Sequence, residues 1–193
     1  MSRSYRLTRR RKITLISALL ALVIILGQHF GWLSKAGENL EKNQPGLYTV
    51  TGFSDGDTIT IDMNGKKEKI RFIGVDTPET HKPNAPVQCY GPAASAFTKN
   101  FIGKNKVRLE SDPLSTNRDR YDRLLRYVYL QDGTLVNLRL IEDGYGFYYP
   151  YFPFHKSDQF AAAQEKAKAS SRGVWGNCTP TMTDRGGYLS NDI

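Results

Sequence analysis

The chain has 193 residues and a formal net charge of +8, from 27 basic and 19 acidic side chains. Its length favours one domain of about 130–150 residues with short appendages over several domains. Six basic residues lie within the first twelve positions, which leaves 21 basic against 19 acidic side chains. The net charge of the remaining chain therefore identifies no partner.

The N-terminus combines a basic segment, residues 1–12, with an uncharged apolar segment, residues 13–33. By the positive-inside rule, this order keeps the N-terminus in the cytoplasm and exports the rest of the chain. The most apolar part, 13–26, suits a cleaved signal peptide. The full segment, with Trp32 as an interfacial aromatic, reaches the roughly 20 residues that span a bilayer. We expect a signal anchor with the folded part outside the cytoplasm, or a secreted protein if the segment is cleaved.

After a polar linker over residues 34–46, the chain becomes rich in β-forming residues. Alternation of apolar and polar residues predicts three strands, and Asn64-Gly65 is a strong hairpin signal. The three strands are expected over residues 48–53, 58–63 and 66–75. Asp57 then enters the second strand and Arg71 lies along the third.

The remaining elements alternate between helices and strands. We expect helices over 91–102, 135–143 and 157–172, strands over 106–110 and 124–130, and a disordered tail over 179–193. Gly144 is expected to end the second of these helices and Ser157 to cap the third. The fold class is α+β, mainly β. Five strands with a helix between the third and fourth predict a small closed barrel of the OB type; an open α+β sheet is the alternative.

Three carboxylates, Asp57, Asp76 and Glu79, fall on strand ends or loops of the same meander. Oxygen ligands of this kind suit a hard cation such as Ca²⁺ or Mg²⁺. The histidines, at positions 29, 81 and 155, have no ligand spacing, which disfavours zinc.

Two arginines, Arg71 and Arg123, are expected to converge on the same cleft. A divalent cation with two guanidinium groups suits a phosphodiester whose charge rises in the transition state. Glu79 would then serve as general base or orient the attacking water. The alternative is a set of solvated turn carboxylates and surface arginines, because Asp-Thr-Pro-Glu is also an ordinary loop or helix-cap string.

From about residue 49 to 178, the chain resembles the thermonuclease (staphylococcal nuclease-like) family, whose fold is an OB barrel with three helices. The resemblance rests on several motifs in order along the chain. They are Asp55-Gly56-Asp57-Thr58, residues 71–80 ending in Val-Asp-Thr-Pro-Glu-Thr, residues 90–98, Asp119-Arg120-Tyr121-Asp122-Arg123, and Gly173-Val174-Trp175. The expected domain spans residues 47–178.

The resemblance implies a Ca²⁺-dependent endonuclease that cleaves DNA and RNA with little sequence choice and leaves 3′-phosphate ends. It implies Ca²⁺ ligands at Asp57, Asp76 and the carbonyl of Thr77, with Glu79 serving the water. Arg71 and Arg123 would bind the scissile phosphate. Arg120 and Tyr121 would contact the substrate. No obligate protein partner is expected, and we expect a monomer.

The sequence departs from the family at two places. Asp122 stands where the family usually has glycine, and its charge is expected to pair with Arg120 or Arg123 and weaken phosphate binding. The following aromatic segment is shorter and richer in proline. Tyr148, Tyr149 and Tyr151 are therefore candidates either for base stacking or for packing between barrel and last helix.

Two cysteines, Cys89 and Cys178, lie far apart and lack the spacing of a zinc site. In an exported protein, such a pair invites a disulfide that closes a long loop. The resemblance implies the same pairing.

A second hypothesis is a nuclease-like module that only binds nucleic acid or protein. Degenerate copies of that kind have lost the carboxylates or arginines, which this chain retains.

Overall fold

The computed structural model describes residues 9–29, 46–80 and 86–193. These belong to two units that divide between Lys42 and Asn43. The first contains one helix, α1 (Arg9–His29). No helix in the described part of the chain is long and apolar enough to cross a membrane. The predicted membrane-spanning segment thus has no support here, and its residues 30–33 lie outside the described residues, as do 1–8 of the basic segment and 34–45 of the linker.

The second unit is a closed five-stranded barrel with the strand order β1-β2-β3-β6-β5. Its strands are β1 (Tyr48–Asp55), β2 (Thr58–Met63), β3 (Lys66–Phe72), β5 (Lys106–Glu110) and β6 (Leu124–Tyr129). β5 returns to β1 and closes the barrel, so the OB-type prediction is confirmed and the open sheet is excluded. β3 and β6 pair in parallel, which brings the end of β3 next to the start of β6.

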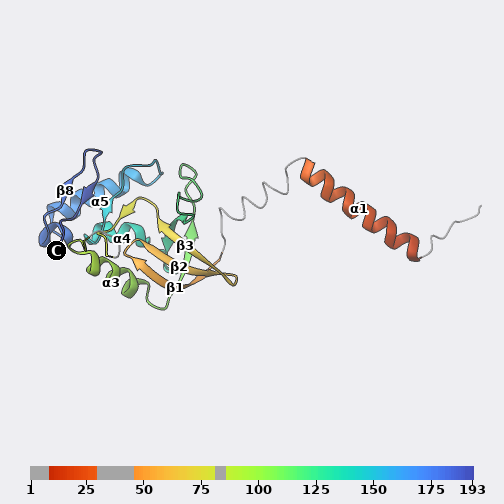
Figure 1. Ribbon diagram of the computed structural model, residues 1–193, viewed down its shortest axis with the longest axis horizontal. Helices are drawn as coiled ribbons and strands as arrows, with labels where there is room; N and C mark the ends of the chain where they lie inside the picture. The colour runs from red at the N-terminus through yellow and green to blue at the C-terminus, as the bar shows by residue number, and fades with distance from the viewer. Residues whose placement is uncertain (1–8, 30–45, 81–85) are drawn as a thin grey trace, which may run out of the picture. The chain divides into compact units, whose positions relative to one another are not determined.

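Three principal helices pack around the barrel (Figure 1): α3 (Gly91–Ile102), α4 (Val136–Glu142) and α5 (Ser157–Ala169). A single-turn helix, α6 (Val174–Asn177), follows them. Asn137 of α4 is fully buried and binds three backbone groups, the N–H of Val128 and the carbonyls of Ile73 and Arg126. These bonds fasten α4 to the end of β3 and to β6, where the polar residues gather.

Two small sheets were not predicted. The expected third strand stops at Phe72 and resumes as β4 (Val75–Asp76), which pairs with β7 (Phe147–Tyr148). The second sheet is a hairpin of β8 (Thr181–Met182) and β9 (Tyr188–Leu189).

The prediction of a disordered tail over 179–193 is wrong. The segment has few apolar residues, but Tyr188 is buried and several other residues are held by hydrogen bonds. The Cys89 N–H donates to the Asn191 carbonyl at 2.7 Å and the Ile193 N–H to the Val87 carbonyl at 3.0 Å. The chain therefore ends beside the start of α3 (Figure 1).

The cap prediction for the last long helix is also wrong. The N-cap residue is Lys156, with no side-chain capping bond. The Ser157 hydroxyl instead lies 2.6 Å from the Tyr148 hydroxyl, so that side chain fastens the aromatic segment to the helix. Gly144, with φ of 74°, follows α4 as expected.

Candidate active site

Asp57 is the most buried of the three expected carboxylates, with 5% of its surface exposed. It is the second residue of the β1–β2 turn. Its Oδ2 accepts from the Thr77 backbone N–H at 2.8 Å and from the Thr77 hydroxyl at 3.0 Å, while its Oδ1 accepts from Thr58 at 2.9 Å. A side chain at Gly56 would meet Thr77 Cγ2 at 2.8 Å, so glycine permits this close approach. The β1–β2 turn and the loop after β4 are thus locked together.

Arg71 joins the two aspartates from the end of β3. Its Nη2 lies 2.6 Å from Asp76 Oδ1 and 3.3 Å from Asp57 Oδ2. Its Nη1 donates to the carbonyls of Val75 at 2.6 Å and Phe72 at 3.1 Å. Burial opposes the charge on Arg71, but Asp57 and Asp76 outweigh it and raise the pKa of the guanidinium. The guanidinium is therefore fixed at the meeting point of the two carboxylates.

Asp76 lies among charged groups of both signs. Burial raises its pKa to about 6; Arg71 opposes the rise, and Asp57 and Glu79 add to it. The charges of Glu79 and Arg123 both act on Asp76, so the structure brings together all five residues expected to carry the chemistry.

Glu79 lies three residues after Asp76, in a segment that is held by hydrogen bonds to Gln88 and Asp55. Its backbone N–H donates to the Gln88 side chain at 2.9 Å, and its carbonyl accepts from the Gln88 backbone N–H at 2.9 Å. Thr80 donates to Asp55 at 2.6 Å. Gln88 was not predicted, and an isolated glutamine in a loop gives no sequence signal.

The predicted disulfide is confirmed, since Cys89 and Cys178 are bonded with Cα atoms 6.0 Å apart. Because Cys89 directly follows Gln88, the disulfide ties the segment that braces Glu79 to the end of α6. It closes a loop with a sequence separation of 89 residues.

Arg123 reaches the site from a loop before β6. Asp119 holds it, with Oδ2 at 2.7 Å from both Nε and Nη2. Asp119 Oδ1 accepts the backbone N–H groups of Tyr121 and Arg123 at 2.9 and 3.0 Å. Burial would raise the pKa of Asp119, but the hydrogen bonds from Arg123 and Tyr121 hold it below the usual value. Asp119 thus fixes the Arg123 side chain, and we call this contact the clamp. Asp119 is part of the sequence motif, but the sequence did not indicate this role.

Two of the predicted substrate contacts lie in the loop that carries Arg123. Arg120 and Tyr121 are exposed, and the Arg120 Nη2 donates to the Tyr121 hydroxyl at 2.7 Å, so both are accessible beside Arg123. Asp122, in the same loop, does not pair as predicted. Its carboxylate lies 3.6 Å from the Arg118 Nε, and its side chain is 87% exposed. The predicted pairing with Arg120 or Arg123 is wrong because φ of 62° at Asp122 turns the side chain away.

The three tyrosines also separate. Tyr148 bonds Ser157 and packs near Phe154, so it belongs to the packing between barrel and α5. Tyr149 and Tyr151 line a cavity of about 730 Å³ together with Arg71 and Arg123. The ring of Tyr149 lies 5.8 Å from the Arg71 guanidinium. These two tyrosines remain candidates for base stacking.

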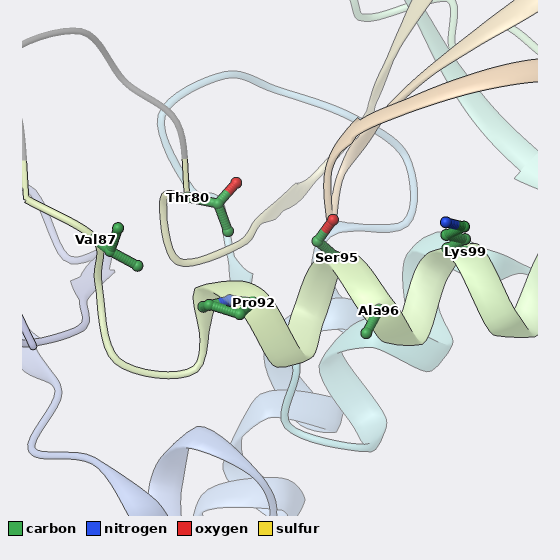
Figure 2. Close-up of a pocket in the computed structure, with 6 residues that line it drawn as sticks. All are labelled: Thr80, Val87, Pro92, Ser95, Ala96 and Lys99. Atoms are coloured by element: carbon green, nitrogen blue, oxygen red, sulfur yellow. The ribbon is translucent and has the colours of Figure 1, made fainter.

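A second hollow, of about 420 Å³, lies along α3 and contains none of the expected catalytic side chains. Figure 2 shows Thr80 and Val87 facing Pro92, Ser95, Ala96 and Lys99 on the helix. Its one charged lining residue is Lys99, so it lacks the acids and guanidiniums of a hydrolytic site. The larger cavity is the candidate active site.

The donor set around Arg71 fits a hard cation. Arg71 lines the larger cavity, and the two aspartates that it contacts lie behind it, outside the lining. Two aspartates share one guanidinium, Glu79 adds negative charge, and oxygen atoms supply the donors. Among the described residues, no three His, Cys, Asp or Glu side chains cluster closely enough to hold a metal by themselves. A cation here would therefore need backbone carbonyl and water oxygens beside the two aspartates.

Comparison with known proteins agrees with the barrel and the site. The family model described as "Staphylococcal nuclease homologue" matches residues 69–177. A thermonuclease of Staphylococcus hyicus is 39% identical over 168 residues, which covers 86% of this chain and 95% of that protein. Endonuclease YncB of Bacillus subtilis (strain 168) is 41% identical over 161 residues, covering 81% and 72%. A thermonuclease of Staphylococcus intermedius is 38% identical over 166 residues, covering 81% and 92%.

The protein is a nuclease, a hydrolytic enzyme. This class follows from the barrel, from these relatives, and from the arginines that line the larger cavity, called the groove below, with the carboxylates that hold them. The chain belongs to the staphylococcal nuclease family.

Proposed function

We propose that this protein is a Ca²⁺-dependent, sugar-non-specific endonuclease that hydrolyses DNA and RNA to 3′-phosphate ends. The observation that carries the proposal is the position of one Arg71 nitrogen, within 3.3 Å of both Asp57 and Asp76. This geometry supports a site in which cation ligands and a phosphate-binding guanidinium lie side by side.

Asp57, Asp76 and the Thr77 carbonyl would hold the Ca²⁺, which when bound supplies positive charge against the scissile phosphate. Arg71 and Arg123 bind the two non-bridging oxygens, whose charge grows in the transition state. Both guanidiniums are held before substrate arrives, by Asp57 and Asp76 in one case and Asp119 in the other. Little reorganisation is then needed during the reaction.

Glu79 accepts a proton from the attacking water. The water oxygen forms a bond to phosphorus while the bond between phosphorus and the 5′ oxygen breaks. Solvent water gives a proton to the leaving 5′ oxygen, so the products are a 3′-phosphate and a 5′-hydroxyl. Tyr149 and Tyr151 support the neighbouring nucleotides, and Arg120 and Tyr121 contact the strand. The enzyme acts as a monomer.

The proposed location is outside the cytoplasm. The basic segment before the apolar residues 13–33 supports export, with that segment retained as an anchor or cleaved. The disulfide is consistent with an oxidising compartment.

The test is Glu79→Gln in the full chain, with cleavage of single-stranded DNA and RNA followed in Ca²⁺, in Mg²⁺ and in chelator. The expected result is Ca²⁺-dependent cleavage to 3′-phosphate ends by the wild type. The variant should bind DNA normally but lose about 10²–10⁴-fold in kcat. Binding without cleavage by the wild type in any metal would reject the nuclease proposal in favour of a binding module.

A further inference from the structure

The C-terminal hairpin lies beyond the family match yet borders the active-site cavity. The match ends at residue 177, and the hairpin of β8 and β9 follows it. Arg185, in the turn of this hairpin, lines the same cavity of about 730 Å³ as Arg71 and Arg123. The end of the chain therefore adds a cation to the groove from outside the matched region.

The base of the hairpin is fixed by one buried aromatic residue. Tyr188 packs between Phe147, at a centroid distance of 6.1 Å, and Trp175, at 4.9 Å. Its hydroxyl accepts from Lys168 Nζ at 2.8 Å. The Ser190 hydroxyl donates to the Cys89 carbonyl at 2.8 Å, next to the disulfide. These contacts place the turn on the body of the enzyme.

The turn itself is seated on Tyr151. The Tyr151 hydroxyl lies 2.6 Å from the Thr183 hydroxyl, and a side chain at Gly187 would clash with the Tyr151 phenol. Glycine at this position is thus required for the contact. The Arg185 guanidinium lies 4.7 Å from the centre of the Tyr151 ring. Its positive charge also reaches Tyr149, where it opposes the rise that burial causes in the pKa of that phenol.

Arg185 differs from Arg71 and Arg123 in its partners. Arg71 and Arg123 are each held by aspartates, whereas Arg185 forms no ion pair within the described part of the chain. Of the residues lining the cavity, five are arginines and one, Asp119, is acidic. A guanidinium at an aromatic rim, with no carboxylate on it, retains its donors for a phosphate.

We propose that Arg185, seated on Tyr151, forms an additional phosphate subsite that binds a backbone phosphate next to the scissile one. This rests on the proposed function, since it assumes a nucleic acid strand in the groove. The substrate class that benefits is a strand with several phosphates, rather than a molecule with a single phosphodiester.

The test compares two substrates in the full chain: an octanucleotide, and a dinucleotide with one phosphodiester. In Arg185→Gln, KM for the octanucleotide should rise about tenfold, the loss expected for one charged hydrogen bond. KM for the dinucleotide should stay at the wild-type value. The slope of log Kd against log salt for octanucleotide binding should fall by about 0.7, the contribution of one phosphate on a single strand.

The matched control is Lys104→Gln, which removes one positive charge from an exposed turn that does not line the cavity. It should change neither KM nor the salt slope. An unchanged octanucleotide KM in Arg185→Gln, or an equal rise for both substrates, would overturn the subsite.

Failure of the proposed function is recognised separately. If the wild type cleaves neither substrate, fluorescence anisotropy with the octanucleotide still gives the salt slope. A lower slope in Arg185→Gln would then support the subsite without catalysis, and an unchanged slope would reject it.

Discussion

Arg71 and Arg123 line the same groove but are held there in different ways. Arg71 belongs to a barrel strand, has a side chain 12% exposed, and bonds two carbonyls and two carboxylates. Arg123 belongs to a loop, is 25% exposed, and is held mainly by Asp119. The first guanidinium is therefore part of the folded core, and the second is positioned by a local clamp. Damage to the first should strongly reduce both stability and catalysis, while damage to the clamp should reduce catalysis and cost less stability.

The largest effect is expected from Arg71→Lys. A lysine carries one nitrogen, so it cannot span the Val75 carbonyl and both aspartates as the guanidinium does. We expect kcat to fall about 10²–10³-fold, as for loss of one preorganised donor. Stability should fall by about 3 kcal/mol, because the buried Asp57 and the half-buried Asp76 lose the contacts of the guanidinium. Steady-state kinetics and urea unfolding measure the two effects.

Arg126→Lys is the matched control for a buried strand arginine outside the groove. Arg126 is fully buried and donates to the Asn117 and Leu125 carbonyls. Its replacement should destabilise the protein while kcat stays near the wild-type value. If Arg71→Lys behaves in the same way, Arg71 is structural and has no part in catalysis.

A smaller effect is expected from Asp119→Asn, which breaks the clamp on Arg123. The amide is uncharged and has one acceptor oxygen. It cannot serve both the guanidinium, which Asp119 Oδ2 holds, and the backbone N–H groups of Tyr121 and Arg123, which Oδ1 holds, so Arg123 becomes less well oriented. We expect kcat to fall about 10–100-fold, the scale of misplacing a binding group by about 1 Å. A variant with wild-type kcat would show that the clamp is dispensable.

The same variant tests the electrostatics of the clamp. Because the pKa of Asp119 is lowered in the folded state, its ionised form stabilises the protein above the pKa of the unfolded state. That contribution is lost as the pH falls through the folded-state pKa. The difference in unfolding free energy between wild type and Asp119→Asn should therefore shrink in acid. A difference independent of pH would contradict the ion pair.

The sequence predicted the elements that depend on local patterns. The Asn64-Gly65 hairpin, the proline at the start of α3 and the alternation in β2 are local signals, and the structure contains each of these elements. The carboxylates and arginines lie at the ends of recognisable strands or in adjoining loops, so their position in the fold could be predicted, while their roles stay predictions.

The features that could not be predicted from the sequence depend on contacts between distant segments. The brace from Gln88 to Glu79, the pairing of β4 with β7 and the hairpin that carries Arg185 all follow from tertiary packing. The tail was misjudged because few apolar residues suggest disorder, although one tyrosine and several backbone bonds are enough to hold it. Asp122 was misjudged because adjacency in sequence does not reveal the backbone φ that directs a side chain.

The smallest effect is expected at Asp122, and it sharpens the contrast between clamp and loop. Its φ of 62° lies in the left-handed region, where glycine is unstrained, and its ion pair with Arg118 is exposed. Asp122→Gly should therefore stabilise the protein by about 0.5–1 kcal/mol. Because the carboxylate faces Arg118 and not Arg123, KM should be unchanged at about 0.15 M salt, where exposed charges are screened over about 8 Å. Asp122→Asn removes the charge and keeps a residue that tolerates this backbone. A lower KM in both variants would mean that Asp122 competes with phosphate for the groove; a gain in stability in the glycine variant alone would assign its cost to the backbone.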